Sequence, residues 1–211
     1  MGCLGHKEKT SNTSGNTLNV TGPENDKYNM SIKSQYQISI LGESKVGKTS
    51  ILNTYFEVPF DINIQSSIGL NRNTKTITVI NQNNETEKVK FIFVDPSGQE
   101  RYRAVAGSII KSADGVLVVF DLTDEDSFEK VSYWIEQVRN ISQKIPIILI
   151  GNKSDLVEER KVTQEKIDEK KEKYNLDYMQ TSALSGENIN ESFQTICQRA
   201  FDSYREQPHE I

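Results

Sequence analysis

Cysteine and long apolar runs are scarce in this chain of 211 residues. Its two cysteines, Cys3 and Cys197, lie almost at opposite ends of the sequence. This spacing excludes a disulfide framework and a cysteine metal cluster, and it favours a reducing compartment. The longest apolar runs, at 116–120 and 145–150, are far shorter than the roughly 18 residues of a membrane span, and both are typical of buried strands. A net charge of −5 argues against the broad basic surface that nucleic-acid binding requires, so we expect no nucleic acid among the partners.

Residues 1–34 have few residues that could form a core. Seventeen of these 34 residues are Asn, Ser, Thr or Gly, and only four are branched aliphatics. Such a segment cannot bury enough apolar surface to offset the entropy lost on ordering. We therefore expect a flexible arm at 1–34, one folded domain at 35–205 and a short tail at 206–211.

Strands and helices alternate from residue 35 onward. Period-two patterns and apolar runs predict strands at 35–41, 70–80, 89–94, 115–121, 145–151 and 177–181. Helical periodicity predicts helices at 50–56 and 164–173, one that starts at a Thr123 or Asp124 cap and runs to Ile141, and a last one through Cys197 and Tyr204. The alternation predicts an α/β fold whose mainly parallel sheet is covered on both faces. Ligands of such sheets bind at the carboxyl ends of the strands.

The loop after the first strand has a phosphate-binding pattern. It reads Gly42-Glu43-Ser44-Lys45-Val46-Gly47-Lys48-Thr49 and leads through Ser50 into a predicted helix. The glycines let backbone N–H groups curl around a polyphosphate, Lys48 adds a positive charge, and Thr49 offers a hydroxyl to Mg²⁺. The alternative is a helix start with an accidental pair of glycines. The strand before the loop and the helix after it favour the phosphate site.

Two later loops supply complementary chemistry. Asp95, at the end of a buried strand, is suited to holding Mg²⁺ through its water shell. In the segment that follows, Gly98 can offer an N–H to a terminal phosphate and Gln99 can orient an attacking water, although this sequence by itself would more often be a surface turn. The Asp155 carboxylate of Asn152-Lys153-Ser154-Asp155 can accept two hydrogen bonds from guanine, a donor pair that adenine lacks. After the last strand, the N–H of Ala183 can reach guanine O6.

Together these segments resemble the Ras superfamily of small GTPases, and within it the Rab family, over residues 35–204. The resemblance implies a P-loop NTPase G domain with a six-stranded sheet, a monomer that binds GTP or GDP with Mg²⁺ and hydrolyses GTP slowly. It assigns catalysis to Lys48, Gly98 and Gln99, and the metal to Thr49, Ser67 and Asp95. It assigns nucleotide contacts to Gly42, Ser44, Lys45, Val46, Gly47, Lys48, Thr49, Ser50, Phe60, Ser67, Gly98, Asn152, Lys153, Asp155, Ser182, Ala183 and Leu184.

The resemblance also implies a role in vesicle trafficking at the cytoplasmic face of endomembranes. The partners would be an exchange factor, a GTPase-activating protein and effectors, and the motifs look most like the early-endosomal Rab group. Departures from the family pattern include Val94 and Pro96 in the second switch, Ser67 in the first, and Leu184. They leave open a GTP-binding interaction module with little hydrolysis, and more remotely an ATP-using phosphate-loop kinase.

The membrane anchor is expected at the N-terminus. The chain begins Met1-Gly2-Cys3 and has no cysteine among its last residues, so prenylation of the usual kind is not expected. Gly2 can take myristate and Cys3 palmitate, and two acyl chains give stable anchoring. His6 stands where the myristoylation pattern usually has a small hydroxyl residue, and the alternative is a polar start without a lipid. Cys197, on an apolar helix stripe, is expected to be a core residue.

Overall fold

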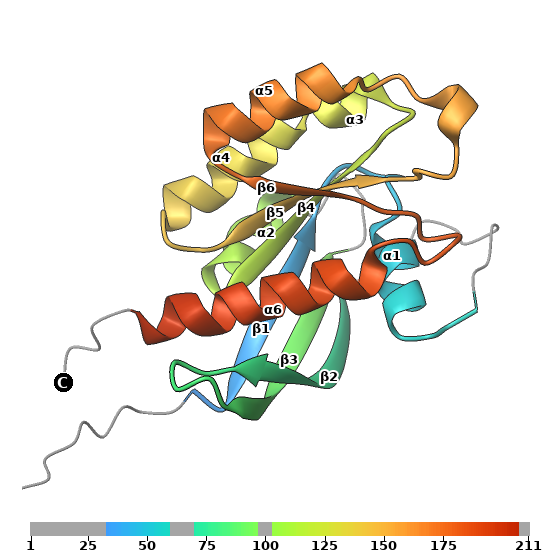
Figure 1. Ribbon diagram of the computed structural model, residues 1–211. Helices are drawn as coiled ribbons and strands as arrows, with labels where there is room; N and C mark the ends of the chain where they lie inside the picture. The colour runs from blue at the N-terminus through green and yellow to red at the C-terminus, as the bar shows by residue number, and fades with distance from the viewer. Residues whose placement is uncertain (1–32, 60–69, 97–102, 207–211) are drawn as a thin grey trace, which may run out of the picture. The chain divides into compact units, whose positions relative to one another are not determined.

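A six-stranded sheet organises the residues that the computed structural model describes, 33–59, 70–96 and 103–206 (Figure 1). The strands are β1 (Gln35–Leu41), β2 (Leu70–Ile80), β3 (Thr86–Pro96), β4 (Gly115–Asp121), β5 (Ile147–Asn152) and β6 (Asp177–Gln180). Their order across the sheet is β2-β3-β1-β4-β5-β6. β2 is antiparallel to β3, and every other neighbouring pair is parallel. The predicted six-stranded, mainly parallel sheet is confirmed.

Helices cover both faces of the sheet, as predicted (Figure 1). They are α1 (Lys48–Tyr55), α2 (Arg103–Lys111), α3 (Glu125–Glu129), α4 (Val131–Ile141), α5 (Gln164–Tyr174) and α6 (Ile189–Arg205), with a short 3₁₀ helix, η2, at Val157–Glu159. α1 and α6 share one hydrophobic core with the sheet, and α2 to α5 share the other. No helix among the described residues is long and apolar enough to cross a bilayer.

A group of aromatic rings packs together in the core beneath α1 and α6. The rings of Tyr55 and Phe193 stack with their centroids 4.0 Å apart, and Phe93 lies edge-on to Phe193 at 5.3 Å. Cys197 is fully buried in the same core, which confirms its expected packing role. This core fixes α1, and therefore the loop that precedes it, against the sheet.

Several predicted boundaries differ from the observed ones for local reasons. β5 begins after Pro146, which has no N–H to donate to a strand partner. α1 begins at Lys48 rather than residue 50, because Gly47 makes the turn in a left-handed conformation and the helix follows at once. The hairpin strand β3 extends from Thr86 to Pro96 and is longer than predicted.

The predicted helix after β4 is in fact two helices. Asp124 caps α3 by accepting a hydrogen bond from the Asp126 N–H, which confirms one of the two predicted caps. Lys130 then separates α3 from α4, since its ψ of −12° departs from the roughly −42° of an α-helix. α2 was not predicted. It is short and contains Gly107, and glycine is a weak helix former.

The two ends of the described domain meet away from the candidate site. Lys33 forms an ion pair with Asp114, and its ammonium lies 5.0 Å from the centre of the Tyr204 ring near the end of α6. Tyr36, at the start of β1, lies edge-on to Tyr204 at 5.6 Å. The chain therefore enters β1 beside the end of α6, at the edge of the sheet opposite the carboxyl ends of the parallel strands. Apart from residues 33 and 34, the predicted arm lies outside the described residues.

Candidate functional site

The loop between β1 and α1 can be built only with glycine at two positions. Gly42 has φ of +142°, and a Cβ there would lie 2.1 Å from the Val119 carbonyl oxygen. Gly47 has φ of +97°, and a Cβ there would lie 2.2 Å from the Asn152 side-chain nitrogen. Both the backbone angle and the lack of space exclude a larger residue. The glycines predicted from the motif are therefore required by the geometry of the loop.

Lys48 lies inside this loop. Its side chain is buried, and Nζ donates hydrogen bonds to the carbonyl oxygens of Gly42 at 3.0 Å and Glu43 at 2.6 Å. Burial lowers the pKa of Lys48, while the nearby charges of Asp95 and Glu43 act in the opposite direction. No side chain caps the N-terminus of α1, so the helix start and the lysine together form a positive end suited to an anion. Ser44 and Lys45 are exposed on the loop, whereas Val46 is buried.

Asp95 and Thr49 meet at the mouth of the loop. Thr49 Oγ1 donates a hydrogen bond of 2.5 Å to Asp95 Oδ2. Asp95 is fully buried, and its Oδ1 has no hydrogen-bond partner among the described residues. Burial raises the pKa of Asp95, although the Thr49 hydroxyl and Lys48 lower it in part. A buried carboxylate oxygen without a partner is costly, and together with the hydroxyl it is a donor set that suits Mg²⁺.

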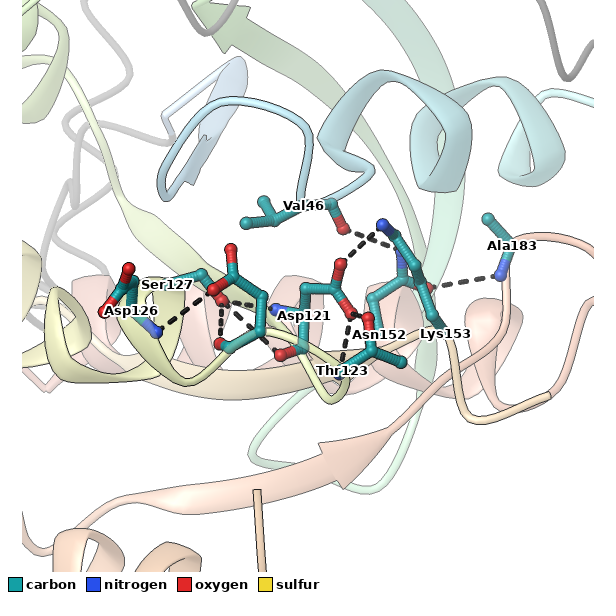
Figure 2. A network of polar contacts seen from close by, with 9 residues as sticks. Val46, Asp121, Thr123, Asp126, Ser127, Asn152, Lys153 and Ala183 are labelled. Atoms are coloured by element: carbon teal, nitrogen blue, oxygen red, sulfur yellow. Dashed lines mark hydrogen bonds and ion pairs between the residues drawn. The ribbon is translucent and has the colours of Figure 1, made fainter. Parts of the chain in front are cut away.

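Asn152 joins three of the loops at the carboxyl edge of the sheet (Figure 2). Its side-chain nitrogen donates to the Val46 carbonyl at 2.9 Å. Its oxygen accepts from the Ala183 N–H and from the Thr181 hydroxyl, both at 3.3 Å. Asn152 is buried, so it ties the phosphate loop to the loops after β5 and β6. In this structure the Ala183 N–H is therefore bonded to Asn152.

The predicted base-reading carboxylate lies at the rim of this region. Asp155 is exposed, and its Oδ1 accepts a hydrogen bond of 2.5 Å from the hydroxyl of Ser182, which is fully buried. The Ser182 oxygen also accepts from the Ser185 N–H at 3.1 Å. The carboxylate is thus oriented by a fixed neighbour yet open to a ligand. Leu184 is exposed beside it.

Asp121 lies at the candidate site and was not predicted from the sequence (Figure 2). Its Oδ2 lies 2.5 Å from Lys153 Nζ. Its Oδ1 accepts hydrogen bonds from the N–H of Thr123 at 2.8 Å and from the hydroxyl of Thr123 at 2.7 Å. Lys153 itself has a left-handed backbone, with φ of +67°. An aspartate that ends an otherwise apolar strand, next to a predicted ligand edge, was the available signal.

The structure brings most of the predicted site residues to one edge of the sheet. These are the residues of the phosphate loop with Ser50, Asp95 at the end of β3, Asn152, Lys153 and Asp155 after β5, and Ser182, Ala183 and Leu184 after β6. Phe60, Ser67, Gly98 and Gln99 lie outside the described residues, as do Gly2 and Cys3. Their roles stay predictions.

Comparison with known proteins agrees with this arrangement. A model of the Ras family matches residues 37–202. The Ras-related protein RABA4b of Arabidopsis thaliana is 35% identical over 169 residues, which are 80% of this chain and 73% of that protein. Rab11A of Lotus japonicus is 37% identical over 169 residues, again 80% and 73% of the two chains. The GTP-binding protein ypt3 of Schizosaccharomyces pombe is 34% identical over 167 residues, 79% and 76% of the two chains.

The family model and these relatives cover most of the folded domain. The match to the family model begins in β1, ends in α6 and includes the loops that follow β1, β3, β4, β5 and β6. The protein therefore belongs to the Ras family of small GTPases, and within it to the Rab proteins.

Proposed function

We propose that this Rab GTPase binds GTP or GDP at the carboxyl edge of its sheet, with the residues of this chain in the roles set out below. The observation that supports this most directly is the Asn152 side chain, which bonds the phosphate loop to the two loops that would read the base. A nucleotide bound at this edge would touch all of these loops. As a Rab GTPase, the protein is a GTP-hydrolysing switch of vesicle trafficking.

Lys48 and the start of α1 would hold the outer phosphates. The lysine ammonium now bonds two loop carbonyls, and a phosphate oxygen is a charged acceptor that would compete well for it. Thr49 would ligate Mg²⁺ directly, and Asp95 would hold it through water. When bound, the metal would supply neutralisation of phosphate charge, and these two residues would hold it.

Asp155 would select guanine. Its carboxylate can accept hydrogen bonds from the ring N–H and the exocyclic amine of guanine, whereas adenine would leave it unpaired. Sites that depend on such hydrogen bonds discriminate by about 10⁴–10⁵. Ser182 supports this role, because its hydroxyl bonds one oxygen of the carboxylate.

Hydrolysis and switching would depend on residues outside the described part of the chain. We expect Gln99 to orient the attacking water, Gly98 to contact the terminal phosphate, and Ser67 to reach the metal only in the GTP state. Phe60 would pack beside the base. An activating protein would accelerate the slow intrinsic reaction by about 10³–10⁵.

The membrane anchor would be acyl chains on Gly2 and Cys3. The Lys33 contacts with Asp114 and Tyr204 support this proposal, because they fix the root of the N-terminal arm away from the nucleotide edge. If the arm tethers the protein to a membrane, the nucleotide site would then stay accessible to regulators. Two acyl chains bind stably where one binds reversibly.

Nucleotide affinities of an Asp155 variant test the nucleotide proposal. We expect Asp155→Asn to lose GDP affinity by a large factor and to gain affinity for xanthosine diphosphate, because the amide supplies a donor that matches the extra xanthine carbonyl. Glu158→Gln is the matched control, since it removes one exposed charge from η2 close by. Unchanged GDP affinity in Asp155→Asn would refute the assigned role of Asp155.

Hydrolysis is tested by single turnover of bound GTP, with Gln99→Leu beside the wild type. We expect slow hydrolysis by the wild type, acceleration by cell extract, and loss of both in the variant. No hydrolysis by the wild type, even with extract, would favour a binding module without turnover. Nucleotide released from the purified protein identifies the base, and finding ATP would contradict guanine selection.

The anchor is tested by intact mass of the protein from its native cell and by fractionation. We expect two acyl masses and a membrane-bound pool that Gly2→Ala abolishes. Cys3→Ser should retain myristate yet bind membranes weakly and reversibly. An unmodified Gly2 with a free Cys3 thiol would exclude this anchor.

A further inference from the structure

A tryptophan on α4 is bonded to the phosphate loop. The Trp134 indole N–H donates a hydrogen bond of 3.0 Å to Glu43 Oε1. The two residues are 91 positions apart in the sequence, and Trp134 is 7% exposed and the only tryptophan in the chain. Its ring lies edge-on to Tyr133 at 5.2 Å. α4 packs against β4 and α2, so the indole N–H is held on a rigid support.

The negative charge of Glu43 is unfavourable for phosphate binding in a phosphate loop. It is the first residue after Gly42, and its carbonyl accepts the 2.6 Å hydrogen bond from Lys48 Nζ. Its carboxylate also acts on Lys48, since the charge of Glu43 favours the charged form of that lysine. A carboxylate that turned fully toward Lys48 would compete with a phosphate for the ammonium and would repel the phosphate itself. Phosphate binding therefore requires a contact that holds the Glu43 carboxylate away from Lys48.

We propose that Trp134 is a positioning residue for nucleotide binding, whose indole N–H holds the Glu43 carboxylate toward α4 and so keeps Lys48 available to the phosphates. This inference rests on the proposed nucleotide site. A buried indole N–H usually has an acceptor, so the competing explanation is that Glu43 only satisfies the tryptophan. If Trp134 positions Glu43, removing the indole N–H lets the Glu43 charge weaken nucleotide binding. If Glu43 only satisfies the tryptophan, removing the N–H leaves nucleotide binding unchanged.

Trp134→Phe tests the proposal, because phenylalanine keeps an aromatic ring and loses only the donor and part of the ring system. We expect GDP release, measured with a fluorescent GDP analogue in saturating Mg²⁺, to become about tenfold faster. Glu43→Gln keeps an acceptor without a charge and should release GDP no faster than the wild type. Trp134→Phe combined with Glu43→Gln should return release to within about twofold of Glu43→Gln alone, because no charge remains to compete for Lys48.

Val138→Ala is the matched packing control. Val138 is fully buried one turn further along α4, so its truncation should lower the melting temperature and leave GDP release within about twofold of the wild type. Release at the wild-type rate in Trp134→Phe, or a double variant as fast as Trp134→Phe alone, would overturn the proposal. A Val138→Ala variant that releases GDP as fast as Trp134→Phe would overturn it too.

A second measurement does not depend on the folding of any variant. Because Trp134 is the single tryptophan, emission from the unmodified protein reports on the surroundings of this indole beside the phosphate loop. We expect the emission to change when chelation and washing remove the nucleotide, and unchanged emission would contradict the coupling. A wild type that binds no GDP at all would refute the proposed nucleotide site itself, which separates failure of the function from failure of this inference.

Discussion

Lys153 Nζ lies 2.5 Å from Asp121 Oδ2, and this ion pair joins the ends of the neighbouring strands β4 and β5. The Asp121 side chain is 7% exposed and the Lys153 side chain 33% exposed. Burying a carboxylate this deeply is costly unless it is paired, and both oxygens of Asp121 have partners, because Oδ1 accepts two hydrogen bonds from Thr123. Asp121 therefore determines where Lys153 points, in the segment that is predicted to read the base.

Replacing Asp121 should weaken nucleotide binding without any change to the residues predicted to touch the base. In Asp121→Asn the Lys153 ammonium loses its partner, and we expect GDP affinity to fall about tenfold. Titration with a fluorescent GDP analogue measures this. Asp124→Asn is the control, since the Asp124 side chain caps α3 and asparagine also caps helices well. Equal affinities in the two variants would contradict the role of Asp121.

Two glycines of similar chemistry should respond differently to alanine. Gly42→Ala would place a methyl group 2.1 Å from the Val119 carbonyl, so we expect loss of stable folding or of GDP binding. Gly107→Ala, inside α2, meets nothing within 4 Å and should raise the free energy of unfolding by about 0.5–1 kcal/mol. Thermal unfolding with and without GDP checks both. A Gly42→Ala protein that binds GDP normally would show that the loop adapts.

Thr49 should make nucleotide retention depend on Mg²⁺. We expect EDTA to speed GDP release strongly in the wild type, because this hydroxyl would help to hold the metal that neutralises the phosphates. Thr49→Val removes the hydroxyl, so its GDP release should be fast already and should respond little to EDTA. Stopped-flow release with and without EDTA measures the difference. The same EDTA response in both proteins would exclude Thr49 as a ligand.

The Cys197 thiol should be inert in the folded protein. It is fully buried, and burial raises its pKa well above the ordinary value, so little thiolate forms and reagent has no access. In Cys3→Ser, where Cys197 is the single cysteine, we expect an alkylating reagent to label the protein only in denaturant. Mass spectrometry gives the extent of labelling. Rapid labelling of the native variant would contradict the placement of Cys197 in the core.

The fold was predictable to the extent that its signals are local. The apolar runs at 115–121 and 145–151 indicated the buried strands β4 and β5, because strands covered on both faces read as continuous apolar sequence. The errors came from local backbone chemistry that periodicity does not capture. β5 begins at Ile147, after Pro146, and not at the predicted residue 145. The predicted helix after β4 is interrupted at Lys130 and forms two helices.

The sequence by itself determined which residue types the candidate site contains, because each motif is a contiguous segment with fixed spacing. Lys48 follows Gly47 directly, and Asp155 lies three residues after Asn152, so their types and order could be read without a structure. Only the tertiary structure decided which groups orient them. Glu43 meets Trp134 and Lys153 meets Asp121 because neighbouring strands and a packed helix bring distant residues together, and such pairs leave no pattern in a single sequence.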